Sequence, residues 1–287
     1  MIKSRSIAVV LGVAALAAGF SATSFAAGGE GIKIDRQKWS FSGMTGTYDS
    51  QQLQRGFGVY KEVCAACHGL SRIAFRNLAQ PGGPEFKEDQ VKALAASYEV
   101  PAEPDDEGEV KPRPGRLADR FPELYANENA ARAAQNGALP PDLSVIAKAR
   151  GVPYTGTWYA HPLAMAKDIV TAYQEGGADY LYALLTGYKD EPPKGVTVPE
   201  GMNYNAAYPG HMIAMANPLS ADLGIYNDGT PETVENYARD VSAFLSWASD
   251  PTLNQRKQTG WMVMIFLLIT TVLLYVSKRR IWAGVKH

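Results

Sequence analysis

Cys64-Ala65-Ala66-Cys67-His68 is the stretch of this 287-residue chain around which the rest is organised. It has the pattern C-x-x-C-H, by which a c-type haem is attached to protein. Two thiols three positions apart can each form a thioether to one edge of the porphyrin. The histidine that follows is then placed to bind the iron. The stretch therefore predicts one covalent haem c, held through Cys64 and Cys67 and ligated by His68.

A CxxC pair also occurs in zinc sites and in redox dithiols, so both remain alternatives to haem. A structural zinc site usually needs a second pair of ligands. This chain has only these two cysteines, and its other histidines are scattered, at positions 161, 211 and 287. A thioredoxin-like dithiol would lie in a βαβ pattern, whereas the residues around Cys64 have helical spacing. The adjacent His68 favours haem over both.

The first 26 residues have the pattern of a secretory signal, with an uncleaved membrane anchor as the alternative. Lys3 and Arg5 precede an apolar run from Ile7 to Phe20, and Ser24-Phe25-Ala26 is a small-x-small cleavage site. Cleavage implies export. Residues 27–258 are therefore expected to form the haem domain outside the cytoplasm, where attachment of haem to a CxxCH motif is expected.

Residues 259–277 are predicted to span a membrane as a helix, the alternative being a buried helix of a soluble protein. The segment from Gly260 to Val276 has no charged residue, and 19 helical residues cover roughly 28 Å, close to the hydrocarbon thickness. Three aromatic residues would mark the interfaces: Trp261, Tyr275 and Trp282. Four basic residues follow: Lys278, Arg279, Arg280 and Lys286. Residues 278–287 are therefore expected on the cytoplasmic side.

The haem domain is expected to be all-α, of the cytochrome c type, with long loops. Helices are predicted at about 50–65, 85–98, 127–136, 142–150, 163–174, 178–186 and 231–249. Asp142 is expected to cap the fourth of these, and Thr230 to cap the last, with Pro231 at its first position. Gly56 lies inside the first helix at a cost of roughly 1 kcal/mol relative to alanine. We therefore expect the 231–249 helix to cross there, with Phe244 or Trp247 against Gly56.

The charge of the chain is unevenly distributed. Residues 27–258 hold all 29 acidic residues and 22 of the basic ones, so this part carries a net charge of −7. An acidic domain argues against a nucleic-acid partner and suits a basic protein partner, although solubility alone would explain it. The acidic loop at 101–116 has the same two explanations, and a solvated loop is the simpler one.

An iron with one histidine ligand is either open, for gas binding or catalysis, or closed by a second ligand for electron transfer. A thioether as the second ligand favours Fe(II) and raises the potential. The candidates beyond the motif and outside the membrane are Met165, Met202, Met212 and Met215. The Pro- and Gly-rich loop at 189–230 contains the last three. It also contains His211, which is a competing ligand.

The segment from Gln54 to His68 resembles the haem region of the cytochrome c1 family, the c-type subunit of the ubiquinol–cytochrome c reductase (cytochrome bc1) complex. The likeness covers nearly all of the chain after residue 26. It continues through Arg113–Leu117, Ala130–Ala134, Gly137–Leu143, Leu184–Tyr188, Pro209-Gly210, Ile213-Ala214-Met215 and Asp228–Pro231.

The resemblance implies specific roles for residues of this chain. The axial methionine of the family lies in an Ile-Ala-Met segment after Pro-Gly, which matches Met215. Arg150 matches an arginine that contacts a haem propionate, and Tyr180 matches a tyrosine beside the haem. Residues 151–177 look like an insertion relative to the shorter mitochondrial form, which suggests a bacterial protein.

The resemblance also implies a place in a complex. The chain would not be an enzyme on its own. It would pass single electrons from the Rieske iron–sulfur protein to a soluble or tethered cytochrome c, beside cytochrome b in a dimeric complex of the bacterial inner membrane. The alternative is a membrane-anchored c-type carrier of another respiratory complex. An open haem that binds ligands or catalyses is a third possibility.

Overall fold

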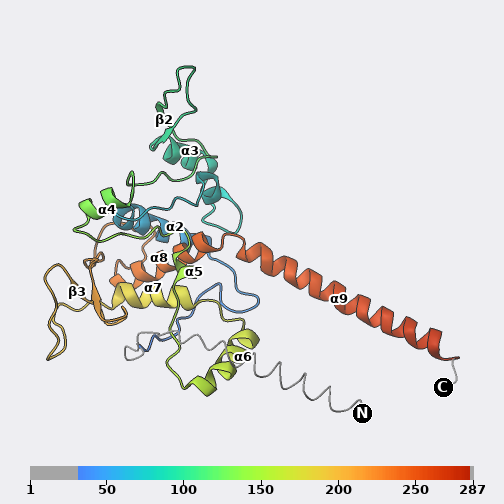
Figure 1. Cartoon of the computed structure of the whole chain (residues 1–287). Coiled ribbons are helices and arrows are strands. Elements are labelled where there is room, and N and C mark those ends of the chain that lie inside the picture. The colour runs from blue at the N-terminus through green and yellow to red at the C-terminus, as the bar shows by residue number, and fades with distance from the viewer. Residues whose placement is uncertain (1–31, 285–287) are drawn as a thin grey trace, which may run out of the picture. The chain divides into compact units, whose positions relative to one another are not determined.

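The computed structural model describes residues 32–284, so the predicted signal at 1–26 and the basic residue Lys286 lie outside the described residues. The described part is mostly helical and has only short strands (Figure 1). The predicted all-α class is therefore confirmed. The strands form two antiparallel pairs, β1 with β2 and β3 with β4.

The elements follow the predicted order along the chain. The helical elements are α2 (Ser50–Val59), η1 (Tyr60–Cys64), η2 (Phe75–Ala79), α3 (Glu88–Ala96), α4 (Glu128–Ala134), α5 (Ile146–Ala149), η3 (Trp158–Ala160), α6 (His161–Thr171), α7 (Gly176–Thr186), α8 (Val234–Ser249) and α9 (Leu253–Trp282). The strands are β1 (Glu99–Pro101), β2 (Pro112–Pro114), β3 (Asn203–Tyr204) and β4 (Met212–Ile213).

Helices α2 and α8 pack against each other at the centre of the haem domain. A Cβ atom added to Gly56 would lie 2.7 Å from the Cβ of Phe244 and closer still to the backbone oxygen of Asp240. This confirms the prediction that Gly56 marks a close crossing against Phe244. The buried Asp240 carboxylate secures the crossing, because it accepts hydrogen bonds from Arg55 Nε (2.7 Å) and from Tyr226 Oη (2.8 Å).

Two predicted helix starts are wrong, because the expected capping residues are engaged elsewhere. Helix α5 begins at Ile146 rather than at 142, since the Asp142 carboxylate accepts from the backbone N–H of Ser71 and of Ser144, each at 2.8 Å. Helix α8 begins after Thr233, whose hydroxyl caps it. The N–H of Thr230 instead donates to Asp228 in a local turn. Both predicted caps therefore stabilise loops.

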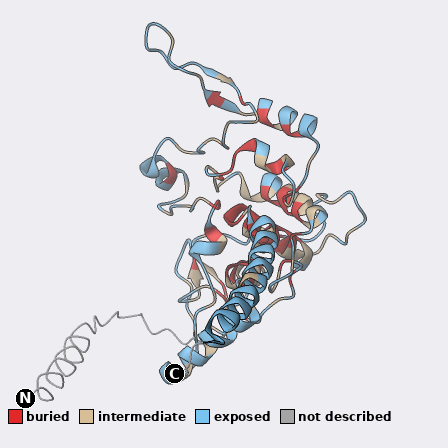
Figure 2. Cartoon of the chain, turned by 90° about the vertical axis from the view of Figure 1, so that its right-hand side faces the viewer, coloured by how far each residue is buried: buried red, intermediate tan, exposed pale blue. Residues whose placement is uncertain are grey.

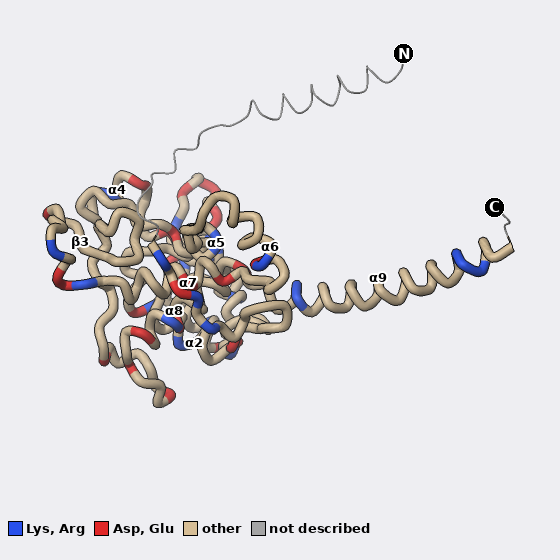
Figure 3. Tube along the Cα trace, turned by 90° about the horizontal axis from the view of Figure 1, so that it is seen from below, with Lys and Arg blue, Asp and Glu red and all other residues tan. Residues whose placement is uncertain are grey.

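Helix α9 contains the predicted membrane span and is the one helix in residues 32–284 that is long and apolar enough to cross a bilayer. Its 30 residues cover about 45 Å at the usual rise. Only Leu253 at its start is buried, and nearly all of the helix beyond Lys257 lies exposed (Figure 2). Charged residues lie only near its two ends (Figure 3).

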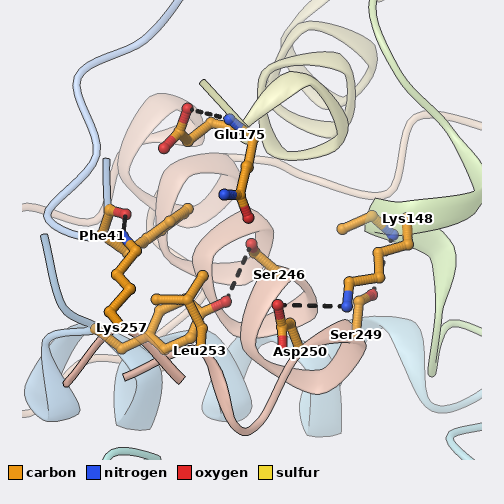
Figure 4. Close-up of a pocket in the computed structure, with 11 residues that line it drawn as sticks. Phe41, Lys148, Glu175, Ser246, Ser249, Asp250, Leu253 and Lys257 are labelled. Carbon is orange, nitrogen blue, oxygen red and sulfur yellow. Dashed lines mark hydrogen bonds and ion pairs between the residues drawn. The ribbon is translucent and has the colours of Figure 1, made fainter. Parts of the chain in front are cut away.

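A short, strongly bonded junction joins α9 to the haem domain. The Asp250 carboxylate, between α8 and α9, pairs with Lys148 Nζ (3.3 Å) and with Arg256 Nη1 (2.7 Å). Lys257 Nζ donates to the backbone oxygens of Phe41 (2.7 Å) and Gly46 (2.9 Å). A small cavity of about 80 Å³ lies beside Lys148, Asp250 and Lys257, and no residue of the CxxCH motif lines it. Figure 4 shows the side chains that line this cavity.

Candidate haem site

The CxxCH motif begins in a π-helical turn. Residues 50–64 are helical, as predicted, but the last five form the π-helix η1, in which the N–H of Ala65 donates to Tyr60 O at 2.8 Å. Turns of this kind occur mostly as short bulges, frequently at functional sites. The buried Tyr60 also donates its hydroxyl to His68 O at 3.1 Å. One tyrosine therefore joins the two ends of the motif.

Both cysteines are free thiols in the structure. The N–H groups of Cys67 and His68 donate to Cys64 O at 3.1 and 2.9 Å, so the motif folds into one tight turn. Burial, and to a lesser extent the neighbouring Cys67, raise the pKa of the Cys64 thiol to about 12. A reactive dithiol needs a lowered pKa instead. The raised pKa of Cys64 therefore disfavours the dithiol alternative.

The imidazole of His68 is oriented by one hydrogen bond. Its Nδ1 donates to the backbone oxygen of Pro141 at 2.8 Å, because a carbonyl can only accept. This tautomer leaves Nε2 without a proton and able to bind iron, which is the usual arrangement of a metal-ligating histidine. Burial lowers the pKa of His68, which favours the neutral ring.

Met215 is half-buried and follows the small sheet of β3 and β4. Two side chains hold its backbone oxygen, since Tyr188 Oη donates to it at 3.1 Å and Asn203 Nδ2 at 3.4 Å. Tyr188 lies two residues beyond the end of α7 and forms a β-bridge with Asn205. The segment around Met215 is thus fixed by groups far from it in sequence.

The competing ligands occupy different surroundings. Met165 lies exposed on α6, and Met202 is also exposed. Met212 lies in β4. The ring of His211 stacks on Tyr204 with the centroids 5.6 Å apart, and its Nδ1 lies 3.2 Å from the backbone oxygen of Asn205.

Arg150 and Tyr180 lie near each other. Burial raises the pKa of Tyr180 in α7, and the positive charge of Arg150 acts against this rise. Arg150 is exposed at the end of α5, and its guanidinium forms no hydrogen bond or ion pair with the residues that the structure describes. Lys148, two residues earlier, is instead paired with Asp250. Arg150 is therefore the cation of this segment that remains available to an acidic group.

Comparison with known proteins identifies the family. A model of the Cytochrome C1 family matches residues 39–285. The chain belongs to the cytochrome c1 family. It is 46% identical to cytochrome c1 of Blastochloris viridis, over 98% of this chain and 95% of that protein. It is 44% identical to the "cytochrome b-c1 complex catalytic subunit, mitochondrial" of Candida albicans, over 93% of this chain and 83% of that protein.

A third relative is longer than this chain. Cytochrome b/c1 of Bradyrhizobium diazoefficiens is 49% identical over 86% of this chain, which spans only 35% of that protein. The cytochrome c1 family is a haem c family, and the donor set found here fits that group. It comprises two adjacent thiols, an imidazole with a free Nε2, and a thioether on a fixed loop.

The described contacts group these residues into two halves. The motif half contains Cys64, Cys67 and His68, tied to Pro141. The methionine half contains Met215 and Tyr188, and Tyr188 lies beside Tyr180 and hence near Arg150. No hydrogen bond or ion pair joins the two halves directly within residues 32–284. The segment 141–150 connects them, because it begins at the His68 ring and ends beside Tyr180.

Sequence reasoning missed the residues that support the site. The oxygen of Pro141, the hydroxyl of Tyr60 and the hydroxyl of Tyr188 were not singled out for these contacts. All three lie in segments that carry the family resemblance: Gln54–His68, Gly137–Leu143 and Leu184–Tyr188. That resemblance was the available signal, but it gives no contact partner.

Proposed function

We propose that this chain is the haem c subunit of a ubiquinol–cytochrome c reductase. In this role it accepts single electrons from a Rieske iron–sulfur protein and delivers them to a soluble or tethered cytochrome c. The observation that carries the proposal is the His68 ring, whose Nδ1 is tied to Pro141 O and whose Nε2 is free for iron. When bound, haem c supplies one-electron chemistry at the iron.

The chain's own residues would each have a defined task. Cys64 and Cys67 would hold the haem covalently, and His68 and Met215 would ligate the iron from opposite faces. Tyr188 and Asn203 would keep the methionine segment in place through its backbone oxygen. An iron closed on both faces has no site for substrate. The domain would then transfer electrons and exclude water without making or breaking bonds.

Arg150 and Tyr180 would act on the rim of the haem. The guanidinium of Arg150 has no acidic partner among residues 32–284, so it is available to a haem propionate. Tyr180 is buried next to it and next to Tyr188. A positive charge at this place would favour the reduced haem by Coulomb attraction.

The names of the relatives support a complex with cytochrome b. One relative is named as a cytochrome b-c1 complex subunit, and another bears both cytochrome names in one protein. By this reading residues 1–26 are a signal and 27–258 stand in the periplasm. Residues 259–277 cross the inner membrane and 278–287 are cytoplasmic. The complex would be dimeric, with cytochrome b, the Rieske protein and a cytochrome c acceptor as partners.

Substituting the proposed axial ligand tests the closed iron. In Met215→Leu the haem should stay attached, because neither thioether is changed. The midpoint potential should fall and carbon monoxide should bind the reduced protein, because the thioether ligand is lost. A redox titration and a carbon monoxide difference spectrum measure both effects.

Met212→Leu is the matched control, since it changes a methionine three residues earlier and should leave the potential unaltered. An unchanged potential in Met215→Leu would place the ligand elsewhere, with His211 as the next residue to substitute. The complex itself is tested separately. A haem protein that runs alone in mild detergent, without cytochrome b and an iron–sulfur protein, would favour another membrane-anchored carrier.

A further inference from the structure

The segment of η3 and α6 exposes large apolar side chains on several sides. Six of them are between 54% and 86% exposed: Trp158, Tyr159, Leu163, Met165, Ile169 and Val170. No residue of α6 is buried in the haem domain. A helix that is apolar around most of its circumference is normally covered, and exposed apolar patches of this kind mark interaction sites. We call these six residues the α6 patch.

The α6 patch lies next to the place where α9 leaves the haem domain. Gln174, just after α6, accepts from Arg256 Nη2 of α9 at 3.3 Å. The neighbouring Glu175 accepts from the N–H of Gly43 at 3.3 Å. Met44, the residue after Gly43, accepts through its backbone oxygen from Trp261 Nε1 of α9 at 3.4 Å. Figure 3 accordingly shows α6 on the side of the domain from which α9 extends.

The position of Trp261 along α9 matters because Trp261 is the first aromatic residue of the apolar span. Tryptophan and tyrosine accumulate at the two membrane–water interfaces, where one end of the ring is apolar and the other end polar. Trp261 is such a residue at the domain-facing end of α9. Trp158 and Tyr159 at the start of the α6 patch are of the same two kinds, and both are exposed. The patch and the span thus share their chemistry as well as their position.

The charges around the α6 patch also suit a lipid surface. Residues 151–171 contain one acidic residue, Asp168, and it is paired with Arg36 at 2.6 Å. The exposed Lys167 is the one basic residue of the same stretch. The segment therefore presents no unpaired anion, in a part of the chain that carries −7 overall. A surface of anionic lipid would attract it rather than repel it.

We propose that the α6 patch lies in the interfacial layer of the bilayer and forms a second membrane contact of the haem domain beside α9. The inference rests on α9 spanning the membrane and does not depend on the electron-transfer role. The apolar side chains would be buried among lipid headgroups and upper acyl chains, as in interfacial helices. The contact would fix the tilt of the haem domain on the membrane surface.

Spin labels on the full-length haem protein test the contact. Ile169→Cys is labelled after maturation, when Cys64 and Cys67 are already in thioether bonds, and reconstituted into nanodiscs of phosphatidylcholine and phosphatidylglycerol. Collision of the label with oxygen, which concentrates in lipid, is compared with collision with a water-soluble nickel chelate. Val110→Cys, exposed on the loop between β1 and β2, is the control for water. Val263→Cys in α9 is the reference for lipid.

The label at position 169 should have an oxygen-to-nickel ratio several-fold above that at position 110 and close to that at position 263. A ratio equal to that at position 110 would mean that the patch faces water, and would overturn the proposal. Poor access for both reagents would mean that protein covers the patch, through a second copy or a partner subunit, and would overturn it as well. A label at Leu163→Cys repeats the measurement if the first variant fails to mature. The midpoint potential of each variant shows separately whether the haem site is intact.

Discussion

The motif half and the methionine half of the proposed haem site are held in different ways. His68 lies four residues beyond the end of a buried helix, and the hydrogen bonds that shape its turn come from within residues 60–68. Met215 lies in an irregular loop, and its backbone is held by Tyr188, 27 residues away, and by Asn203. One half is therefore specified mainly locally, with distant contacts from the Pro141 oxygen to the His68 ring and from Gln135 Nε2 to Cys67 Sγ (3.6 Å). The other half exists only once several distant segments have come together.

Because the two halves are held differently, damage to each half should change a different property of the haem. Damage to the motif half should prevent or weaken attachment of the haem and its histidine ligation. Damage to the methionine half should leave the haem attached and change the closure of the iron and its potential. Substitutions can act on the crossing of α2 and α8, on one half of the site, or on electrostatics alone. Their effects should therefore differ in kind as well as in size.

The largest effect is expected from Gly56→Ala, because both halves rest on the crossing of α2 and α8. The added Cβ would meet the backbone of Asp240 and the Cβ of Phe244. Neither can move without displacing α8, so overpacking should cost about 3 kcal/mol of unfolding free energy. Denaturant titration of the haem protein measures the loss.

Gly58→Ala is the control for Gly56→Ala, since its Cβ would meet no backbone atom and would lie 3.2 Å from one side-chain atom, Cγ2 of the half-buried Ile225. It should change the unfolding free energy by no more than about 1 kcal/mol. Equal losses in the two variants would show that the crossing does not depend on Gly56.

Asp142→Ala should weaken the motif half alone. It removes the acceptor of two backbone N–H groups, those of Ser71 and Ser144, next to the oxygen that orients His68. We expect a loss of about 2 kcal/mol in unfolding free energy, with carbon monoxide still excluded from the iron. Thermal denaturation followed at the haem absorption band measures it. Asp106→Ala, on the exposed acidic loop, should leave the transition unchanged, and an identical shift there would contradict the assigned role.

Tyr188→Phe should loosen the methionine half alone. It removes one hydroxyl and its hydrogen bond to Met215 O, for a loss of about 1 kcal/mol. Carbon monoxide should bind the reduced variant slowly and partially, because the methionine segment opens more often. The rate of binding after flash photolysis measures this. Tyr204→Phe is the control, since that ring stacks on His211 and its hydroxyl has no partner among residues 32–284. Equal rates in both variants would show that the Tyr188 hydroxyl does not hold the methionine segment.

The smallest structural effect is expected from Arg150→Ala, which should test electrostatics without changing either half. The side chain is exposed, so stability should change by less than about 0.5 kcal/mol. The midpoint potential should fall modestly, because a positive charge near the haem favours the reduced state. The same substitution at the exposed Arg116 should have no effect on the potential. A potential that does not respond to Arg150→Ala would exclude the propionate contact.

The sequence predicted those features that depend on local pattern or on one steric requirement. The apolar run gave the span within α9, and the glycine at position 56 indicated the close helix crossing. The predicted caps at Asp142 and Thr230 were wrong because each competes with a tertiary or turn contact that local spacing does not reveal. The bonds of Tyr188 and Pro141 could not be predicted either, since they form between segments whose proximity is set by the whole core. The π-helical turn is local, but the apolar spacing of residues 50–65 does not distinguish it from an α-helical turn. The ligand roles of His68 and Met215 stay predictions.

The junction at Asp250 and Lys257 bears on how the haem domain could exchange electrons with a donor and an acceptor. Three residues separate α8 from α9, and four bonds from these two side chains fasten the helix base to the domain. Such a joint leaves no slack for the domain to swing toward a donor or an acceptor. In the proposed role, the haem domain would therefore stay in place while it passes electrons. The electron donor and the electron acceptor would have to move to reach it.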